Sequence, residues 1–208
     1  MILSPEQFAG FLAAAVVITV SPGPDNLMVL GVGMSRGRKA GMAFGLGCAL
    51  GCLSHTLLAT LGVSALIAAS PMAFSALKIF GGLYLVWLGF GALRSSGGAK
   101  VGVAAGEESL LKLFGKGLFA NSINPKVVLF FLSFLPQFVV PEHGSVSLQT
   151  ALLGLTFTAQ GCILFGTLGY FSGTVGQWIS ATPKAGLWLD RVAGTIFVGL
   201  GLRLIVAR

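Results

Sequence analysis

The sequence contains few charged residues: 13 Lys and Arg and 6 Asp and Glu make up only 9% of 208 residues. Soluble domains carry roughly 25% charged residues, because a folded chain of this size needs a polar surface. Together with 55% hydrophobic residues and a mean hydropathy of +0.91, this scarcity excludes an ordinary water-soluble domain and indicates a membrane protein. The net charge is +7, but the basic residues are dispersed, so we expect no nucleic-acid partner.

Other chemistries are excluded by residues that are rare or missing. The three cysteines, Cys48, Cys52 and Cys162, form no C-x-x-C pair, which argues against a thiol-disulfide electron carrier and favours packing roles. With two histidines and no H-E-x-x-H we expect no metal site, and without G-x-x-x-x-G-K-[ST] the chain has no means of hydrolysing ATP. We therefore expect neither an enzyme nor a cofactor, and a gradient of protons or another coupling ion remains as the energy source for moving a solute.

Long apolar runs predict an all-α membrane protein with about six transmembrane helices, since one span takes about 20 apolar residues. Charged residues and prolines separate the runs, because a charge at the bilayer centre costs about 3 kcal/mol. The first basic side chain is Arg36, so the first run lacks the charged flank of a signal peptide and is expected to stay in the mature protein. The predicted spans are 8–34, 41–68, 73–93, 114–138, 147–175 and 185–206.

The basic residues predict the orientation. They are concentrated in the first, third and fifth connections and nearly absent from the second and fourth, which places both termini outside. Small polar residues at 95–110 predict a cytoplasmic linker. This linker divides a single transporter domain, 1–208, into halves of three helices each, 1–94 and 111–208.

The two halves carry a faint repeat, in which residues 78–85 resemble residues 191–198 at the start of the third span of each half. Because each half has an odd number of spans, the second half must enter the membrane from the opposite side. The fold class is therefore two inverted three-helix repeats, a pattern of secondary transporters.

Prolines interrupt the first span of each half. Ser-Pro-Gly-Pro-Asp at 21–25 breaks the first span, and Asn-Pro-Lys at 124–126 breaks the fourth. A Ser or Asn before Pro matches the N-cap and first position of a helix, so each span is expected to resume as a second half-helix. Gly23, between two prolines, is expected to supply backbone φ freedom and room for a substrate.

The breaks place opposite charges at one depth. Asp25 lies about 16 Å along the helix from Arg36, and Lys126 about 15 Å from Lys116, where each charge alone is expensive. We expect them to pair with each other or to face water, with the positive ends of the half-helices beside them to bind a carboxylate. The alternative is that the prolines only kink the helices. The candidate substrate-binding residues are Pro22, Gly23, Pro24, Asp25, Asn26, Asn124, Pro125 and Lys126.

Three polar side chains in other positions, His55, Gln160 and Gln137, are candidates for a proton relay or for a polar lining of the path. The alternative is that they form interhelical hydrogen bonds. The glycines of the second and fifth spans favour close helix packing.

Five motifs in order resemble those of the LysE/RhtB family of bacterial amino-acid exporters over nearly the whole chain. They are P-G-P at 22–24 followed by D-N, the Gly-rich second span with His55, G-x-Y-L-x-W-L-G at 82–89, N-P-K at 124–126 and L-P-Q-F at 135–138. The resemblance implies a multi-pass protein of the bacterial inner membrane that exports small, mostly neutral amino acids by gradient-driven secondary transport. The threonine, homoserine and leucine-type branch is the most similar. A basic amino-acid exporter of the same family and a metal-ion transporter of related architecture are the alternatives, and assembly into a homo-oligomer is left open.

Overall fold

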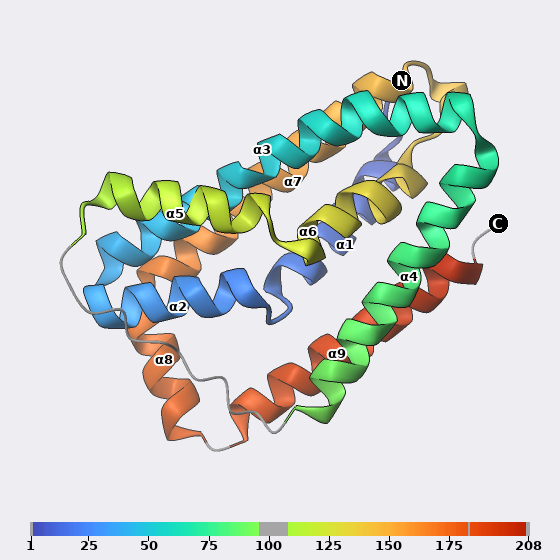
Figure 1. The fold of residues 1–208 in the computed structure, drawn as a ribbon. Helices are drawn as coiled ribbons and strands as arrows, with labels where there is room; N and C mark the ends of the chain where they lie inside the picture. The colour runs from blue at the N-terminus through green and yellow to red at the C-terminus, as the bar shows by residue number, and fades with distance from the viewer. Residues whose placement is uncertain (1, 96–107, 183, 207–208) are drawn as a thin grey trace.

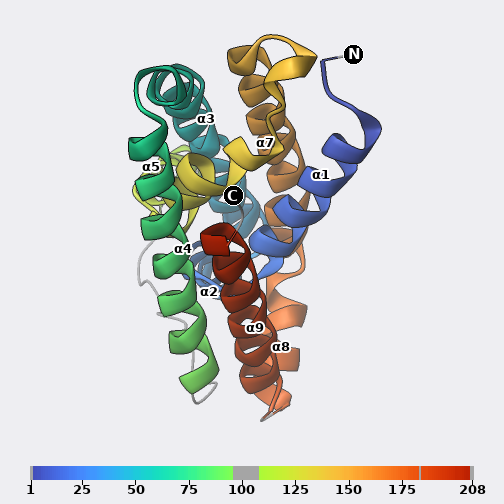
Figure 2. The same cartoon turned by 90° about the vertical axis from the view of Figure 1, so that its right-hand side faces the viewer.

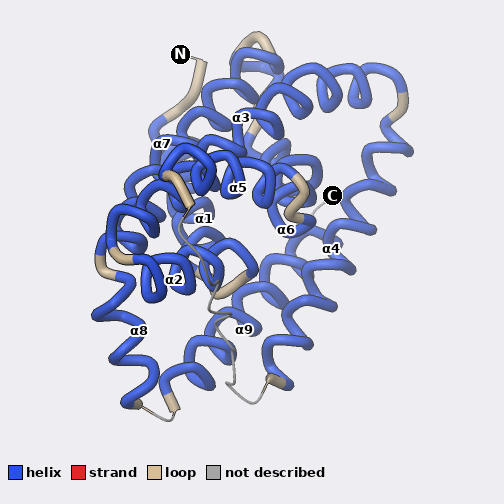
Figure 3. Tube along the Cα trace, turned by 60° about the vertical axis from the view of Figure 1, so that its left-hand side comes forward, coloured by secondary structure: helices blue, strands red, loops and turns tan. Residues whose placement is uncertain are grey.

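The structure is a computed structural model that describes residues 2–95, 108–182 and 184–206. Every regular element in these ranges is a helix (Figures 1 and 3). Most of the predicted linker, residues 96–107, lies outside the described residues. The elements are α1 (Pro5–Val20), α2 (Pro24–Arg36), α3 (Arg38–Ala69), α4 (Pro71–Arg94), α5 (Leu110–Ser122), α6 (Pro125–Leu129), η1 (Phe130–Phe134), η2 (Leu135–Phe138), η3 (Pro141–His143), α7 (Val146–Tyr170), α8 (Ser172–Ala181) and α9 (Ala185–Val206).

The structure supports three to five membrane spans in the described part of the chain. Arg38–Gly62, Ser75–Arg94 and Val146–Tyr170 are each long and apolar enough to cross a bilayer. Two bent pairs count as one span each: α1 and α2 meet at 55°, and Leu110–Ser122 meets Pro125–Phe138 at 49°. The sixth expected span coincides with α9 but is not among these five.

The helices form two groups that pack through glycine. α3 runs alongside α7 and α5, while α4 and α9 lie side by side as a separate pair (Figures 1 and 2). A Cβ added to Gly117 of α5 would collide with the carbonyl of Phe44 on α3, and one added to Gly201 of α9 would collide with the carbonyl of Gly82 on α4. The glycines therefore bring helix backbones into direct contact, as small residues do in membranes.

Apolar side chains cover much of the outside. Leu57, Leu61 and Ile163 are each more than 55% exposed, as are Trp87 and Trp188. A soluble domain rarely exposes so many large apolar side chains, whereas lipid solvates them. The interior holds a cluster of aromatic rings from Phe11, Phe130, Phe131, Phe134 and Phe157.

The predicted fifth span, 147–175, was wrong at its end, because α7 stops at Tyr170 and α8 starts at Ser172. Phe171 between them has ψ of 9° and leaves the helical path. The change of direction lets α8 pack against α2, where the buried hydroxyl of Ser172 lies at Gly33. Phe171 itself is neither proline nor glycine, and the flanking Gly169 and Gly173 do not take up positive φ, so the continuous apolar pattern concealed the turn.

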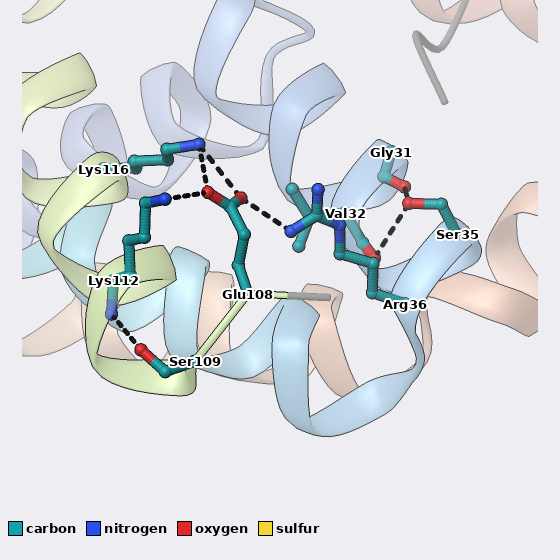
Figure 4. Close-up of polar contacts among 8 residues, drawn as sticks. All are labelled: Gly31, Val32, Ser35, Arg36, Glu108, Ser109, Lys112 and Lys116. Atoms are coloured by element: carbon teal, nitrogen blue, oxygen red, sulfur yellow. Dashed lines mark hydrogen bonds and ion pairs between the residues drawn. The ribbon is translucent and has the colours of Figure 1, made fainter. Parts of the chain in front are cut away.

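An ion cluster ties the C-terminal end of α2 to the start of α5 (Figure 4). The Glu108 carboxylate accepts hydrogen bonds from Lys116 at 2.6 Å and Arg36 at 2.6 Å and forms an ion pair with Lys112 at 3.0 Å. The hydrogen bonds from Lys116, Lys112 and Arg36 lower the pKa of Glu108 from 4.5 to about 2. One carboxylate thus binds three cationic side chains.

The depressed pKa predicts a pH dependence of stability. Replacing Glu108 by Gln should lower the midpoint of thermal unfolding in detergent at pH 6. Because the folded pKa lies below the ordinary value, the carboxylate stabilises the fold above about pH 4.5, and this contribution declines toward about pH 2. The midpoint gap between the wild type and Glu108→Gln should therefore narrow at pH 3. The matched control is exposed Glu142→Gln; a gap equally wide at both pH values would contradict the cluster's role.

Candidate functional site

The first break lies between α1 and α2, and Pro22 explains it. Pro22 has no N–H, so the Ile18 carbonyl four residues earlier receives no helical hydrogen bond. The prediction that Ser21 caps the second half-helix was wrong: its hydroxyl donates back to the Val17 carbonyl at 2.7 Å, and Gly23 is the N-cap of α2. Ser21 therefore ends α1 and leaves the start of α2 to Gly23.

The second break follows the same rule and matches the prediction. The Asn124 side chain accepts a hydrogen bond from the Lys126 backbone N–H at 3.0 Å and caps α6, with Pro125 in the first turn. Pro125 has no N–H to donate to the Asn121 carbonyl, which accepts from the Asn124 N–H at 2.9 Å instead, and His55 Nε2 lies 3.1 Å from the same oxygen. A carbonyl only accepts, so the histidine nitrogen donates. His55 is thus buried at the break.

Lys126 reaches from the second break to the first. Its side chain is buried, and Nζ donates to the Ile18 carbonyl at 3.2 Å and the Ser21 carbonyl at 3.1 Å. It also lies 5.8 Å from the centre of the Phe197 ring on α9, within cation–π range. The ammonium therefore occupies the C-terminal end of α1, where the helix dipole is negative.

Asp25 occupies the opposite kind of helix end. It lies in the first turn of α2, where the dipole is positive, and it is 1% exposed. Its Oδ2 accepts a hydrogen bond of 2.7 Å from Asn121 Nδ2. Among the described residues its Oδ1 has no hydrogen-bond partner.

The expected direct ion pair is absent: no Asp25 oxygen lies within 4.0 Å of Lys126 Nζ. Each charge is instead stabilised by neutral groups and a helix end of opposite polarity. Both side chains nevertheless line one cavity of about 10 Å³, which we call the charged cavity. This volume is roughly the space of a single water molecule. Acid and base thus share a site that is closed to anything the size of an amino acid.

The remaining candidates separate into two groups. Gln160 joins the site, because its Nε2 donates to the hydroxyl of Thr19 at 2.9 Å, and Asn26 Nδ2 donates to the Thr19 carbonyl at 2.9 Å. Gln137 does not join it: its amide donates to the Ser133 carbonyl in the distorted segment that follows α6. Pro136 causes that distortion by removing another helical donor.

The sequence interpretation missed Asn121 and Thr19. Asn121 is fully buried, and its side chain donates to the Asp25 carboxylate. Thr19 connects Asn26 to Gln160 and lines the charged cavity. The sequence did indicate Asn121, because it lies four residues before Pro125 and a proline has no N–H to donate to that carbonyl. For Thr19, an ordinary polar residue in an apolar helix, no signal stood out.

Four buried polar atoms of the candidate residues have no hydrogen-bond partner within the described part of the chain. The acceptors are Asp25 Oδ1, Asn26 Oδ1 and Gln160 Oε1, and the donor is Asn124 Nδ2. The orientations of the amides are fixed, because the nitrogens of Asn26 and Gln160 donate to carbonyls and the oxygen of Asn124 accepts from a backbone N–H. Native proteins rarely leave such atoms unpaired, so the site has unused capacity for three donors and one acceptor.

Gly23 has a different role from the one expected. Its backbone is extended, with φ of −170° and ψ of 178°, so the expectation that it supplies unusual φ freedom was wrong. Space is what requires glycine: a Cβ there would lie 2.7 Å from Lys126 Nζ. The described residues contain no group of three His, Cys, Asp or Glu side chains able to hold a metal ion.

Comparisons with known proteins identify the relatives of this chain. A family model described as LysE type translocator matches residues 16–208. The threonine efflux protein of Escherichia coli is 31% identical over 93% of this chain and 94% of its own length. The homoserine/homoserine lactone efflux protein of Salmonella typhimurium is 27% identical over 98% of both, and the leucine efflux protein of Enterobacter is 28% identical over 95% and 94%. No solved structure matches the chain significantly.

The geometry predicts that Asp25 is coupled to Asn121. In a double-mutant cycle of Asp25→Ala and Asn121→Ala, the free energies of unfolding should be non-additive by about 1.5–3 kcal/mol, because a hydrogen bond to a buried carboxylate is lost once and not twice. The control cycle uses Ser122→Ala in place of Asn121→Ala. The exposed Ser122 hydroxyl is hydrogen-bonded to the Leu118 carbonyl and to the Ser54 hydroxyl. Additivity in both cycles would refute the contact.

A second prediction concerns Gly23. Gly23→Ala should lower the free energy of unfolding by about 1–3 kcal/mol, because the methyl group displaces the Lys126 ammonium from its carbonyls. Gly91→Ala on α4 is the control, since nothing lies within 4 Å of its added Cβ. In a Lys126→Ala background the cost of Gly23→Ala should disappear. A cost that persists there would show that another neighbour limits the space.

Proposed function

The chain belongs to the LysE family, whose members are transporters and not enzymes, and we propose that it exports small, mostly neutral amino acids by gradient-driven secondary transport. One observation carries this proposal: an acid and a base, each buried at a helix break, line one cavity. Discontinuous helices in corresponding places of two halves are typical of transporter substrate sites. The named efflux activities of the relatives are compatible with it.

An amino-acid zwitterion complements these two charges and the unpaired polar atoms of the candidate residues. Lys126 and the unpaired Asn124 amide would hold the carboxylate. The α-ammonium has three N–H donors, which would match the unpaired oxygens of Asp25, Asn26 and Gln160. The substrate would thus replace the carbonyls that now hold Lys126 and satisfy atoms that now have no partner.

Binding requires movement, because the charged cavity holds about one water. We propose that the half-helices α2 and α6 shift against α1 and α5 to open the site to each side of the membrane in turn. The bends of 55° and 49° lie at the two breaks, where few backbone hydrogen bonds resist such a shift. A proton is our proposed coupling ion, carried by Asp25 or by His55.

The two-repeat architecture in the bacterial inner membrane is part of the same proposal. The order of elements is the same in both halves, which supports this arrangement. Each half begins with a broken helix and ends with a helix that has a basic residue near its start. α4 and α9, the two closing helices, pack against each other. With six spans, α9 would cross the membrane, and both termini would lie outside.

Counterflow in proteoliposomes tests the transport function. Vesicles loaded with unlabelled threonine, homoserine or leucine should accumulate the same labelled amino acid, whereas lysine should exchange poorly because Lys126 repels a second cation. Vesicles loaded with a divalent metal ion should show no metal exchange. Exchange of metal but of no amino acid would overturn the proposal in favour of a metal transporter.

The same assay tests the role of Lys126. Lys126→Met should lower amino-acid counterflow at least about tenfold, because the carboxylate loses a charge-assisted hydrogen bond. Lys39→Met, which removes an exposed lysine at the start of α3, is the control and should retain exchange. Equal exchange by both variants would place the carboxylate site elsewhere.

Topology is tested independently. A reporter inserted within residues 95–108 should be cytoplasmic, and a tag at the N-terminus should react with a membrane-impermeant reagent added from outside. Finding both on one side of the membrane would overturn the orientation, whatever the substrate.

A further inference from the structure

A second and larger cavity lies beside the charged one. Its volume is about 350 Å³, within the range of small-molecule sites. It opens between the end of α1, the start of α2, and the helices α7 and α8. Its walls include Thr19, Asn26, Leu164, Phe165 and Val175.

The two cavities share part of their walls. Thr19 and Phe165 line both of them, so only the thickness of these side chains separates the larger cavity from Asp25 and Lys126. Asn26 also lines the larger cavity, and it directly follows Asp25 on α2. The charged groups and the larger cavity therefore belong to one continuous region at the first helix break.

The chemistry of the walls differs between the cavities. Both buried charges lie on the smaller one, and the larger one is lined mainly by aliphatic and aromatic side chains. In an amino acid the side chain is attached to the same carbon that carries the ammonium and the carboxylate. A pocket for that side chain must therefore adjoin the charged groups directly, and the larger cavity meets this requirement.

We propose that the larger cavity receives the side chain of the transported amino acid and that the transporter selects bulky neutral side chains made mostly of hydrocarbon. This inference rests on the proposed function. The volume exceeds what a threonine side chain needs, whereas a leucine or phenylalanine side chain fills more of it and buries more apolar surface. Phe165 and Thr19 lie at the boundary, where the α-carbon of the substrate passes.

Filling the cavity from α7 tests the proposal. Leu164→Trp projects a large ring into the larger cavity from a residue that does not line the smaller one. Counterflow of leucine and phenylalanine should fall about tenfold or more relative to alanine, because a pocket discriminates strongly against groups it has no room for. Alanine exchange should stay within about twofold of the wild type.

The adjacent residue supplies a matched control. Ile163 is 68% exposed on the outside of α7 and lines neither cavity, so Ile163→Trp should leave the leucine-to-alanine ratio unchanged. Val175→Phe fills the cavity from α8 and should change the ratio in the same direction as Leu164→Trp. If Leu164→Trp does not elute as a single folded species with an unchanged unfolding midpoint, the result with Val175→Phe decides whether the cavity is the side-chain pocket.

The outcomes separate this inference from the function on which it rests. If the wild-type protein exchanges amino acids but the filled variants lose alanine and leucine equally, or lose neither, the cavity is not the side-chain pocket, and lipid or packing explains it. If the wild type exchanges no amino acid at all, both the proposed function and the inference that rests on it are refuted. A wild type that exchanges alanine and threonine but not leucine overturns the preference for bulky side chains.

Discussion

The hydrogen bonds between the Lys126 ammonium and two carbonyls of α1 are the interaction on which the site depends. A buried ammonium without partners is several kcal/mol too costly to persist in an apolar interior. Pro22 supplies one partner by leaving the Ile18 carbonyl without its helical donor, and the end of α1 supplies another through Ser21. The break in the first helix and the lysine in the second half of the chain therefore require each other.

The same principle places Asp25. Breaking the helix creates a new positive end at the start of α2, and Asp25 lies in its first turn. Asn121 donates to the carboxylate from α5, and its carbonyl, which receives no donor from Pro125, contacts His55 as well as the Asn124 N–H. Each proline thus withholds a helical donor from a carbonyl that a side-chain nitrogen from another helix contacts. The bonds from Lys126 to α1 and from Asn121 to Asp25 join the two breaks directly. Contacts of glycine with backbone keep α5 and α7 close enough to α3 to preserve this geometry.

Much of this arrangement was predictable because its causes are local. Prolines fix where helices break and restart, so the positions of both breaks, the Asn124 cap and the burial of Asp25 and Lys126 follow from the sequence. The partners of the two charges do not, because they are neutral groups brought in by tertiary packing. Opposite charges at one depth suggested an ion pair, but carbonyls and an amide hold them apart. The turn at Phe171 was also hidden, since its cause is the packing of α8 on α2 and not a residue of unusual backbone preference.

We propose that the two helix breaks together bind both charged ends of an amino acid. The most direct measurement is the unfolding midpoint of the purified protein in detergent with leucine, with 3-methylbutylamine, which lacks the carboxylate, and with 4-methylpentanoate, which lacks the ammonium. A ligand that binds only the folded state raises the midpoint in a saturable way. We expect leucine to raise the midpoint and neither analogue to do so at the same concentration. An equal rise with either analogue alone would contradict it, because one charged end would then suffice.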